Sequence, residues 1–248
     1  MATCGVFLIP PPDHLLYMAG SAVLAYDIRG ERRFTSVLAD EFDEATLAAW
    51  LGPAPAYGIH ATIAAGILEF DERDLGEVDL RLSWLASRLA PFALEGGRFH
   101  DAFPMRPRVL VGTYDSPDGA LSRLERHVLT LISPLRAGSG YDARRNDYDE
   151  GRRRVLDRHG DPNAAEYFIP HWSLATNLPD EAAWLAVRSA IAARTGLFGD
   201  PATRAQDVDE LHLVRRGDGG FYSIAASYRL RGSGNQPSRI ASKDFLRR

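Results

Sequence analysis

The sequence is poor in cysteine, with a single residue of this type, Cys4, among 248 residues. One thiol excludes an internal disulfide framework and any zinc site that is built from several cysteines. Because so low a cysteine content suits a reducing compartment, we expect a cytoplasmic protein.

Net positive charge is also missing. The chain has 29 Lys and Arg residues against 33 Asp and Glu residues, which gives a formal net charge of −4. Such a chain has no general attraction for polyanions, so stable binding to a nucleic-acid duplex is not expected. Any anion site must therefore be local, and a small phosphorylated substrate fits better than a duplex.

Long apolar runs are absent as well. No stretch approaches the roughly 18 apolar residues that a membrane-spanning helix needs, so no membrane partner is expected. The chain starts with MATCGVFLIPPPDHL, which has no basic leading segment, and its apolar run stops at three prolines. This start does not fit a signal peptide.

What remains is an ordinary globular composition, with 45% hydrophobic and 25% charged residues. The patterns of apolar residues, prolines and glycines predict helices and strands in alternation. Strands are expected over 4–9, 59–69, 92–103, 107–115, 167–177, 208–216 and 220–231. Helices are expected over 14–27, 43–52, 76–91, 116–135, 148–160 and 179–196, with Asp13 and Ser116 as N-caps of the first and fourth. Residues 1–231 are predicted to form one domain, and 232–248 a polar tail.

Two short motifs open predicted strands in the two halves of the chain. The first, HATI, begins at His60, and the second, HWSL, begins at His171. Both read histidine, any residue, hydroxyl, apolar residue, and each is followed by a helix and two further strands. The repeated order predicts a duplicated α+β unit with mainly antiparallel sheets.

The spacing within each motif has a chemical meaning. In a strand, residues i and i+2 point to the same face, so His60 lies beside Thr62 and His171 beside Ser173. If the two strands meet at the centre of the molecule, two imidazoles and two hydroxyls surround one cleft. This set suits phosphodiester cleavage, because one histidine can accept a proton while the other donates one. The hydroxyls can donate to non-bridging phosphate oxygens, and no metal is required.

The residues HATI and HWSL resemble the paired H-x-[T/S]-hydrophobic motifs of the 2H phosphoesterase superfamily. The opening GVFLIPPPDHLLYMAGSAVLAYD and the segment AYGIHATI look like its bacterial branch associated with phosphonate-utilisation operons. The resemblance covers about residues 4–231. It implies a bilobal fold in which two sheets face each other across a central cleft, with helices on the outside. The branch often carries arginines before the first motif, where this chain has GPAPA.

Residues near the motifs are further candidates. Tyr57 and Tyr167 can stack on a nucleobase, and Arg106 can bind phosphate, although core packing or a solvated surface explains each of them as well. Trp172 alternates away from the motif side chains and is expected to face the core. His100 and His212 have no hydroxyl two residues further on, so they are interpreted as structural or exposed.

Together these features predict a metal-independent phosphodiesterase that hydrolyses a cyclic phosphate of a nucleotide or ribose derivative. His60 and His171 are the expected acid–base pair, and Thr62 and Ser173 the expected phosphate ligands. No cofactor is expected, because two histidines without a nearby carboxylate or thiol make a poor metal site. Two alternatives stay open, namely RNA 2′,5′-phosphodiester cleavage or ligation, and a non-catalytic nucleotide- or phosphate-binding module. The residues also leave open which histidine is the base, the oligomeric state, and whether 137–165 forms a lid.

Overall fold

The fold is described from a computed structural model of the whole chain. The described residues are 1–103, 106–116, 119–198, 203 and 205–232, and the side chains of 101–107 are not described. The predicted polar tail, from residue 233 onward, lies outside the described residues.

The described chain contains the following helices and strands. The strands are β1 (Ala2–Leu8), β2 (Tyr26–Asp27), β3 (Arg32–Arg33), β4 (Ala61–Phe70), β5 (Phe92–Phe103), β6 (Arg106–Asp115), β7 (Gly138–Ser139), β8 (Trp172–Ala175), β9 (Gln206–Val208), β10 (Glu210–Arg216) and β11 (Tyr222–Arg229). The α-helices are α1 (Leu15–Leu24), α2 (Glu44–Leu51), α3 (Ala54–Tyr57), α4 (Leu75–Ala86), α5 (Ala120–Ile132), α6 (Glu150–His159) and α7 (Glu181–Thr195).

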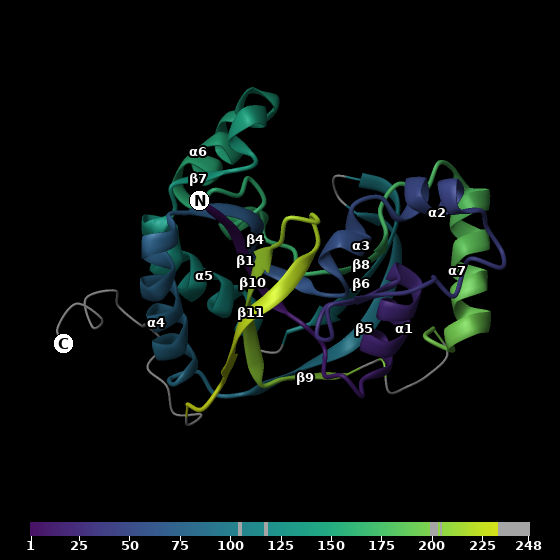
Figure 1. Ribbon diagram of the computed structural model, residues 1–248, viewed down its shortest axis with the longest axis horizontal. Helices are drawn as coiled ribbons and strands as arrows, with labels where there is room; N and C mark the ends of the chain where they lie inside the picture. The colour runs from purple at the N-terminus through teal and green to yellow at the C-terminus, as the bar shows by residue number, and fades with distance from the viewer. Residues whose placement is uncertain (104–105, 117–118, 199–202, 204, 233–248) are drawn as a thin grey trace.

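The strands of the main sheet are neighbours in the order β11-β10-β1-β4-β8-β6-β5-β9, while β2 and β3 form a separate small ribbon (Figure 1). Every pairing between the described strands is antiparallel. We call the four strands from β11 to β4 the first lobe and the four from β8 to β9 the second lobe. The two lobes are joined through β4 and β8 at one registered pair, Ala61 opposite Trp172. The predicted α+β class with a mainly antiparallel sheet is confirmed.

A helix and two strands follow the first motif as predicted, whereas a helix and three strands, β9, β10 and β11, follow the second. The hairpins after the two motifs also change sides. The β5–β6 hairpin follows β4 in the chain and pairs with β8 in the second lobe. The β10–β11 hairpin follows β8 in the chain and pairs with β1 in the first lobe. Each motif strand therefore shares its lobe with the hairpin that follows the other motif.

The strand predicted over 208–216 is in fact two strands. The chain breaks at Asp209, where β9 ends and β10 begins. β9 pairs with β5 in the second lobe, whereas β10 pairs with β1 in the first. The chain at Asp209 therefore connects the two lobes a second time. The two strands that it connects, β9 and β10, are not neighbours of the β4–β8 junction in the strand order.

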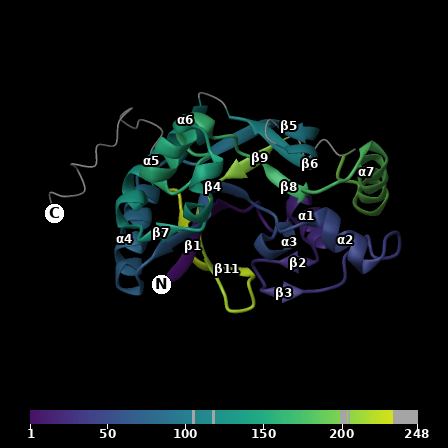
Figure 2. The same ribbon diagram turned by 90° about the horizontal axis from the view of Figure 1, so that it is seen from above.

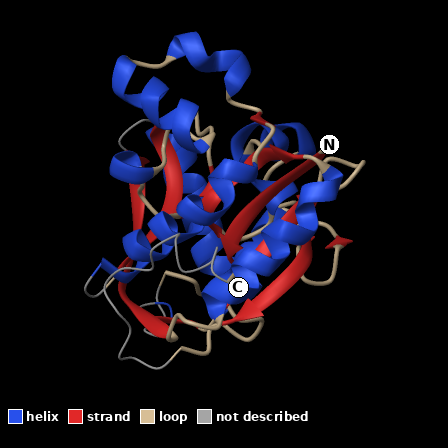
Figure 3. Cartoon of the chain, turned by 90° about the vertical axis from the view of Figure 1, so that its left-hand side faces the viewer, coloured by secondary structure: helices blue, strands red, loops and turns tan. Residues whose placement is uncertain are grey.

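Helices cover the outer sides of the two lobes (Figure 2). α4 packs on β10 and β11, and α5 packs on β4, whereas α7 packs on β6 and α1 on β8. A view from the side of α4 and α5 shows helices in front of the strands (Figure 3). None of the helices in the described ranges combines the length and apolar character needed to span a bilayer.

Two predicted helix starts are shifted. α1 is capped by His14, whose Nδ1 accepts the backbone N–H of Leu16 at 3.1 Å, and not by Asp13. α5 begins at Ala120, although the Oγ of Ser116 still accepts the N–H of Leu121 at 2.8 Å. The side chain of His14 thus caps α1, whereas the N-cap of α5 is Gly119, which has no capping side chain.

Candidate active site

The first motif follows a sharp change of direction at the end of α3. Gly58 ends this helix with φ +66°, and a Cβ atom there would lie 3.0 Å from the Cβ of Ile28. Glycine is therefore required both for its backbone conformation and for space. Ile59 is then fully buried and anchors the chain just before His60.

His60 is held from two sides by its own segment. Its Nδ1 lies 2.9 Å from the carbonyl oxygen of Gly58, and its Nε2 lies 3.1 Å from the Oγ1 of Thr62. A carbonyl oxygen only accepts, so the proton of the neutral ring resides on Nδ1 and Nε2 is left as the acceptor. The Thr62 hydroxyl donates to that nitrogen.

The surroundings of His60 are aromatic. Its ring stacks on Phe7 with 3.9 Å between centroids, and the ring of Tyr57 lies 5.7 Å away. Burial among these groups lowers the pKa of His60 from 6.5 to about 4, against the opposing effect of the Gly58 carbonyl. The positive charge of His171 lowers the pKa of His60 further, so the two imidazoles interact. His60 is neutral at pH 7.

The second motif repeats the backbone contact of the first. The Nδ1 of His171 lies 2.8 Å from the carbonyl oxygen of Ile169, again two residues earlier in the chain. Trp172 is fully buried on the other side, as predicted, together with Leu174, and Trp172 meets Tyr114 edge-on at 5.0 Å. His171 and Ser173 are both half-buried.

The single pair that joins the lobes brings the motifs together. Ala61 lies opposite Trp172, and residues paired across an antiparallel ladder point to the same face. The neighbours of this pair therefore point together to the opposite face, which we call the motif face: His60, Thr62, His171 and Ser173. Because antiparallel strands run in opposite directions, His60 is set against Ser173 and Thr62 against His171. Histidine and hydroxyl alternate around the junction.

His212 lies on the motif face of the first lobe, since Phe7 pairs with both Thr62 and His212. Its side chain is completely buried, with Nδ1 2.9 Å from the Oγ of Ser227 and Nε2 3.4 Å from the guanidinium of Arg29. Burial lowers its pKa to about 3. His212 is thus a structural residue, in line with the sequence-based interpretation.

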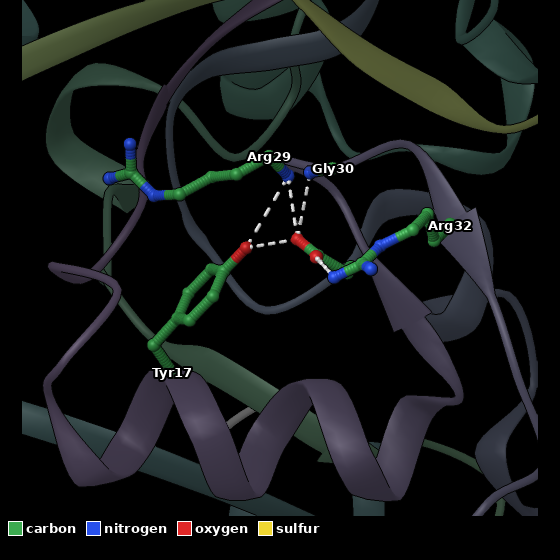
Figure 4. A network of polar contacts seen from close by, with 5 residues as sticks. Tyr17, Arg29, Gly30 and Arg32 are labelled. Atoms are coloured by element: carbon green, nitrogen blue, oxygen red, sulfur yellow. Dashed lines mark hydrogen bonds and ion pairs between the residues drawn. The ribbon is translucent and has the colours of Figure 1, made fainter.

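The backbone and the guanidinium of Arg29 are both held by groups other than His212. The N–H groups of Arg29 and Gly30 donate to the carboxylate of Asp27, and the hydroxyl of Tyr17 donates to the same carboxylate (Figure 4). The guanidinium also donates to the carbonyl oxygens of Ile9 and Pro10, each at 3.2 Å. The turn after β1 is held in place by this network.

The other predicted contact residues differ in their positions. Tyr57 lies beside His60 and stacks on Tyr222 with 4.6 Å between ring centroids. Tyr167 packs under the guanidinium of Arg152, 4.3 Å from the ring centroid. Arg106 begins β6, but its side chain is outside the described part.

The segment 137–165, for which the sequence left open whether it forms a lid, has its strand anchored away from the motifs. Its strand β7 pairs with the far end of β4, where Leu68 lies opposite Ser139. The motif lies at the other end of the same ten-residue strand. The N-terminal part of the segment is therefore fixed to the sheet at a distance from His60.

A cavity of about 220 Å³ lies where the lobes approach each other, beside the first motif. Its wall includes Leu8, which pairs with Ala61, and also Ile9, Arg29, Gln206, Glu210 and Arg229. The four motif side chains are not part of this wall. Within the ranges that the structure describes, no three His, Cys, Asp or Glu side chains gather into a group that could hold a metal ion.

Comparison with known proteins gives structural likenesses only. No family model and no curated protein matches the sequence. TT0787 of Thermus thermophilus is 19% identical with a TM-score of 0.49, covering 94% of this chain and 100% of that chain. LigT of E. coli, solved with 3′-AMP, is 13% identical with a TM-score of 0.49, covering 92% and 98%. Usb1 of Kluyveromyces marxianus is 12% identical with a TM-score of 0.37, covering 92% and 97%.

All these TM-scores are below 0.5, so the functional conclusion depends on the side chains of the motif face and not on the likenesses. The resemblance to the branch associated with phosphonate-utilisation operons stays a prediction, because none of the comparisons bears on it.

Proposed function

We propose that this protein is a metal-independent phosphodiesterase of the 2H type, which hydrolyses a cyclic phosphate of a nucleotide or ribose derivative. One observation carries the proposal: the antiparallel pair of Ala61 and Trp172 joins two histidine–hydroxyl motifs on one face of the sheet. In both motifs the Nδ1 of the histidine is bonded to a backbone carbonyl, so Nε2, on the other side of the ring, is the nitrogen that exchanges a proton with the substrate.

His60 is the general base in this proposal. A ring with a pKa of about 4 is neutral throughout the physiological range, and its Nε2 accepts hydrogen bonds. The hydrogen bond that Thr62 donates to Nε2 supports this role, because it requires a lone pair on that nitrogen. Water, the nucleophile in hydrolysis, gives its proton to this nitrogen while its oxygen forms a bond to phosphorus.

His171 is then the general acid. It donates the proton on its Nε2 to the ribose oxygen as the bond between that oxygen and phosphorus breaks. The products are a phosphate monoester and a free hydroxyl, and the two histidines have exchanged protonation states. Proton exchange with the solvent restores the starting state for the next turnover.

Thr62 and Ser173 stabilise the charge that builds on the phosphate. Each hydroxyl is set against the histidine of the other motif. When the substrate is bound, the Thr62 hydroxyl donates to a non-bridging oxygen instead of to Nε2 of His60, which leaves that nitrogen free to accept the proton of water, and Ser173 donates to a non-bridging oxygen likewise. Donors fixed in a strand cost little reorganisation when the charge develops.

The test is turnover of nucleoside 2′,3′-cyclic monophosphates in the presence of excess chelator. We expect multiple turnovers to a monoester product, with little change when the chelator is added. Dependence on an added divalent cation would contradict the proposed acid–base pair.

The same assay separates the alternatives. Cleavage or joining of 2′,5′-linked oligonucleotides without turnover of cyclic mononucleotides would favour the RNA activity. Binding of cyclic nucleotides with no product in either assay would favour the non-catalytic binding module.

A further inference from the structure

The motif face carries a third imidazole–hydroxyl pair, which the two motifs do not include. His100 of β5 and Thr113 of β6 are joined by a contact of 2.7 Å between Nε2 and Oγ1. The first motif holds the same two groups, His60 and Thr62, at 3.1 Å. The donor set is therefore repeated, with the hydroxyl supplied by a neighbouring strand.

The strand register places this pair beside the second motif. Val111 pairs with Ser173 on one side and with His100 on the other, so these three residues form one row across the sheet. Gly112 pairs with Trp172, so the next residue, Thr113, is the cross-strand neighbour of His171. Both members of the third pair thus lie on the motif face.

The separations follow from the spacing of strands, about 4.8 Å. Thr113 is one strand from His171, and His100 is two strands from Ser173, or about 10 Å between Cα atoms. A group bound by His100 and Thr113 therefore lies roughly 5–10 Å from a phosphate bound by the motifs. A single sugar spans this distance.

A comparison with His212 argues against a purely structural role for His100. His212 also meets a hydroxyl, that of Ser227, but the ring of His212 is itself completely buried and lies against the guanidinium of Arg29. His100 and Thr113 are both half-buried, so they retain access to a ligand.

A cation lies next to the third pair. Arg98 pairs with Thr113 across the strands, and its guanidinium bonds to Asp115 at 2.5 Å. Both of these side chains are more than half exposed. An imidazole, a hydroxyl and a guanidinium in two adjacent rows of the sheet suit the oxygens of a phosphate group.

We propose that His100 and Thr113 bind a second phosphate of the substrate, one sugar away from the cyclic phosphate. The preferred substrate is then a sugar or nucleoside cyclic phosphate that carries a further phosphomonoester on the same sugar. This inference rests on the proposed function of the motifs and specifies its substrate class.

The test compares adenosine 2′,3′-cyclic phosphate with the same compound bearing a 5′-phosphate. For the wild type we expect kcat/KM to be roughly tenfold higher on the 5′-phosphorylated compound, a factor that corresponds to about 1.4 kcal/mol. In His100→Ala and Thr113→Val this ratio should fall to near one. Any general loss of activity cancels in the ratio, and thermal melting checks the fold.

Two matched variants complete the design. Thr113→Ser keeps the hydroxyl and should keep the ratio, and His127→Ala, on α5, removes an imidazole elsewhere and should also keep it. A wild-type ratio near one, or a high ratio that survives both His100→Ala and Thr113→Val, would overturn the inference. Absence of turnover on either compound would instead refute the proposed function, so the two failures are distinguishable.

Discussion

The two motifs share a backbone arrangement but have different surroundings. Both histidines bond through Nδ1 to the carbonyl two residues earlier. Across the strands, however, Thr62 faces the aromatic ring of Phe7, whereas His171 is a neighbour of the hydroxyl-bearing Thr113. The first histidine is stacked on an apolar ring and the second is flanked by polar groups.

This difference explains how two copies of one motif can perform opposite roles. Acid–base catalysis needs one neutral and one protonated imidazole at the same pH. Stacking on Phe7 and burial hold the pKa of His60 near 4 and keep this ring neutral. The sequence of the motif supplies the groups, and the neighbouring strand determines the protonation state.

The largest effect is expected from removing either imidazole. His60→Ala and His171→Ala should each lower kcat by about 10²- to 10⁴-fold, because each removes a proton-transfer group. The double variant should be little worse than either single one, since the two groups act as a unit. Steady-state kinetics on a cyclic phosphate checks this, with circular dichroism as the control of folding.

A smaller effect is expected from the hydroxyls. Thr62→Ala and Ser173→Ala should each lower kcat by about 10-fold, roughly one hydrogen bond to a phosphate oxygen. The variants Thr62→Ser and Ser173→Thr keep the donor and should retain most of the activity. If the alanine variants were as damaging as the histidine variants, the division of roles would be wrong.

The pH profile tests the difference between the histidines directly. A base with a pKa of about 4 is protonated as the pH falls through that value, so kcat/KM should fall on the acid side near pH 4. In Phe7→Leu the ring of His60 is less shielded, and the acid limb should move to higher pH. An unchanged limb in this variant would contradict the role of the stack.

The depressed pKa values of His60 and His212 predict a dependence of stability on pH. In the unfolded chain both residues take up protons as the pH falls through about 6.5. In the folded chain they do so only near pH 4 and pH 3. The free energy of unfolding should therefore be fully retained above about pH 6.5 and decrease towards pH 3. Urea titrations across this range measure it.

The smallest effect on chemistry is expected at His212. His212→Ala removes a completely buried ring together with its contacts to Ser227 and to the guanidinium of Arg29, which costs about 1–3 kcal/mol of stability. The turnover of the folded fraction should stay close to that of the wild type, in contrast to His60→Ala. A stable His212→Ala protein without activity would show that this histidine, too, takes part in the reaction.

Much of the fold could be predicted from local patterns. Residues such as Pro10 and Gly196 punctuate the elements, and the alternation around Trp172 correctly predicted its burial. The pairing partners of the strands could not be predicted, because they depend on contacts between distant parts of the chain. The split at Asp209 is one example, since β9 and β10 pair with strands of different lobes.

In the candidate site, too, contacts between distant parts of the chain could not be predicted. The two motifs were visible because each hydroxyl follows its histidine by two residues in the chain. The hydroxyl that meets His100 lies 13 residues away on the next strand, so no local pattern indicates the pair. The low pKa of His60 likewise depends on Phe7, which reaches it through the pairing of β1 with β4.

The exchange of hairpins between the lobes has a consequence for how the protein is made. β1 is synthesised first, yet one of its two partners, β10, is among the last strands, with Cys4 opposite Arg215. Contacts between such distant residues form slowly, because a long loop must close before they are gained. Neither half of the chain contains a complete lobe, so a nascent chain that has left the ribosome only as far as β8 has both motifs but lacks β10 and β11, which complete the first lobe. Catalytic competence should thus appear late and all at once, when the final hairpin docks.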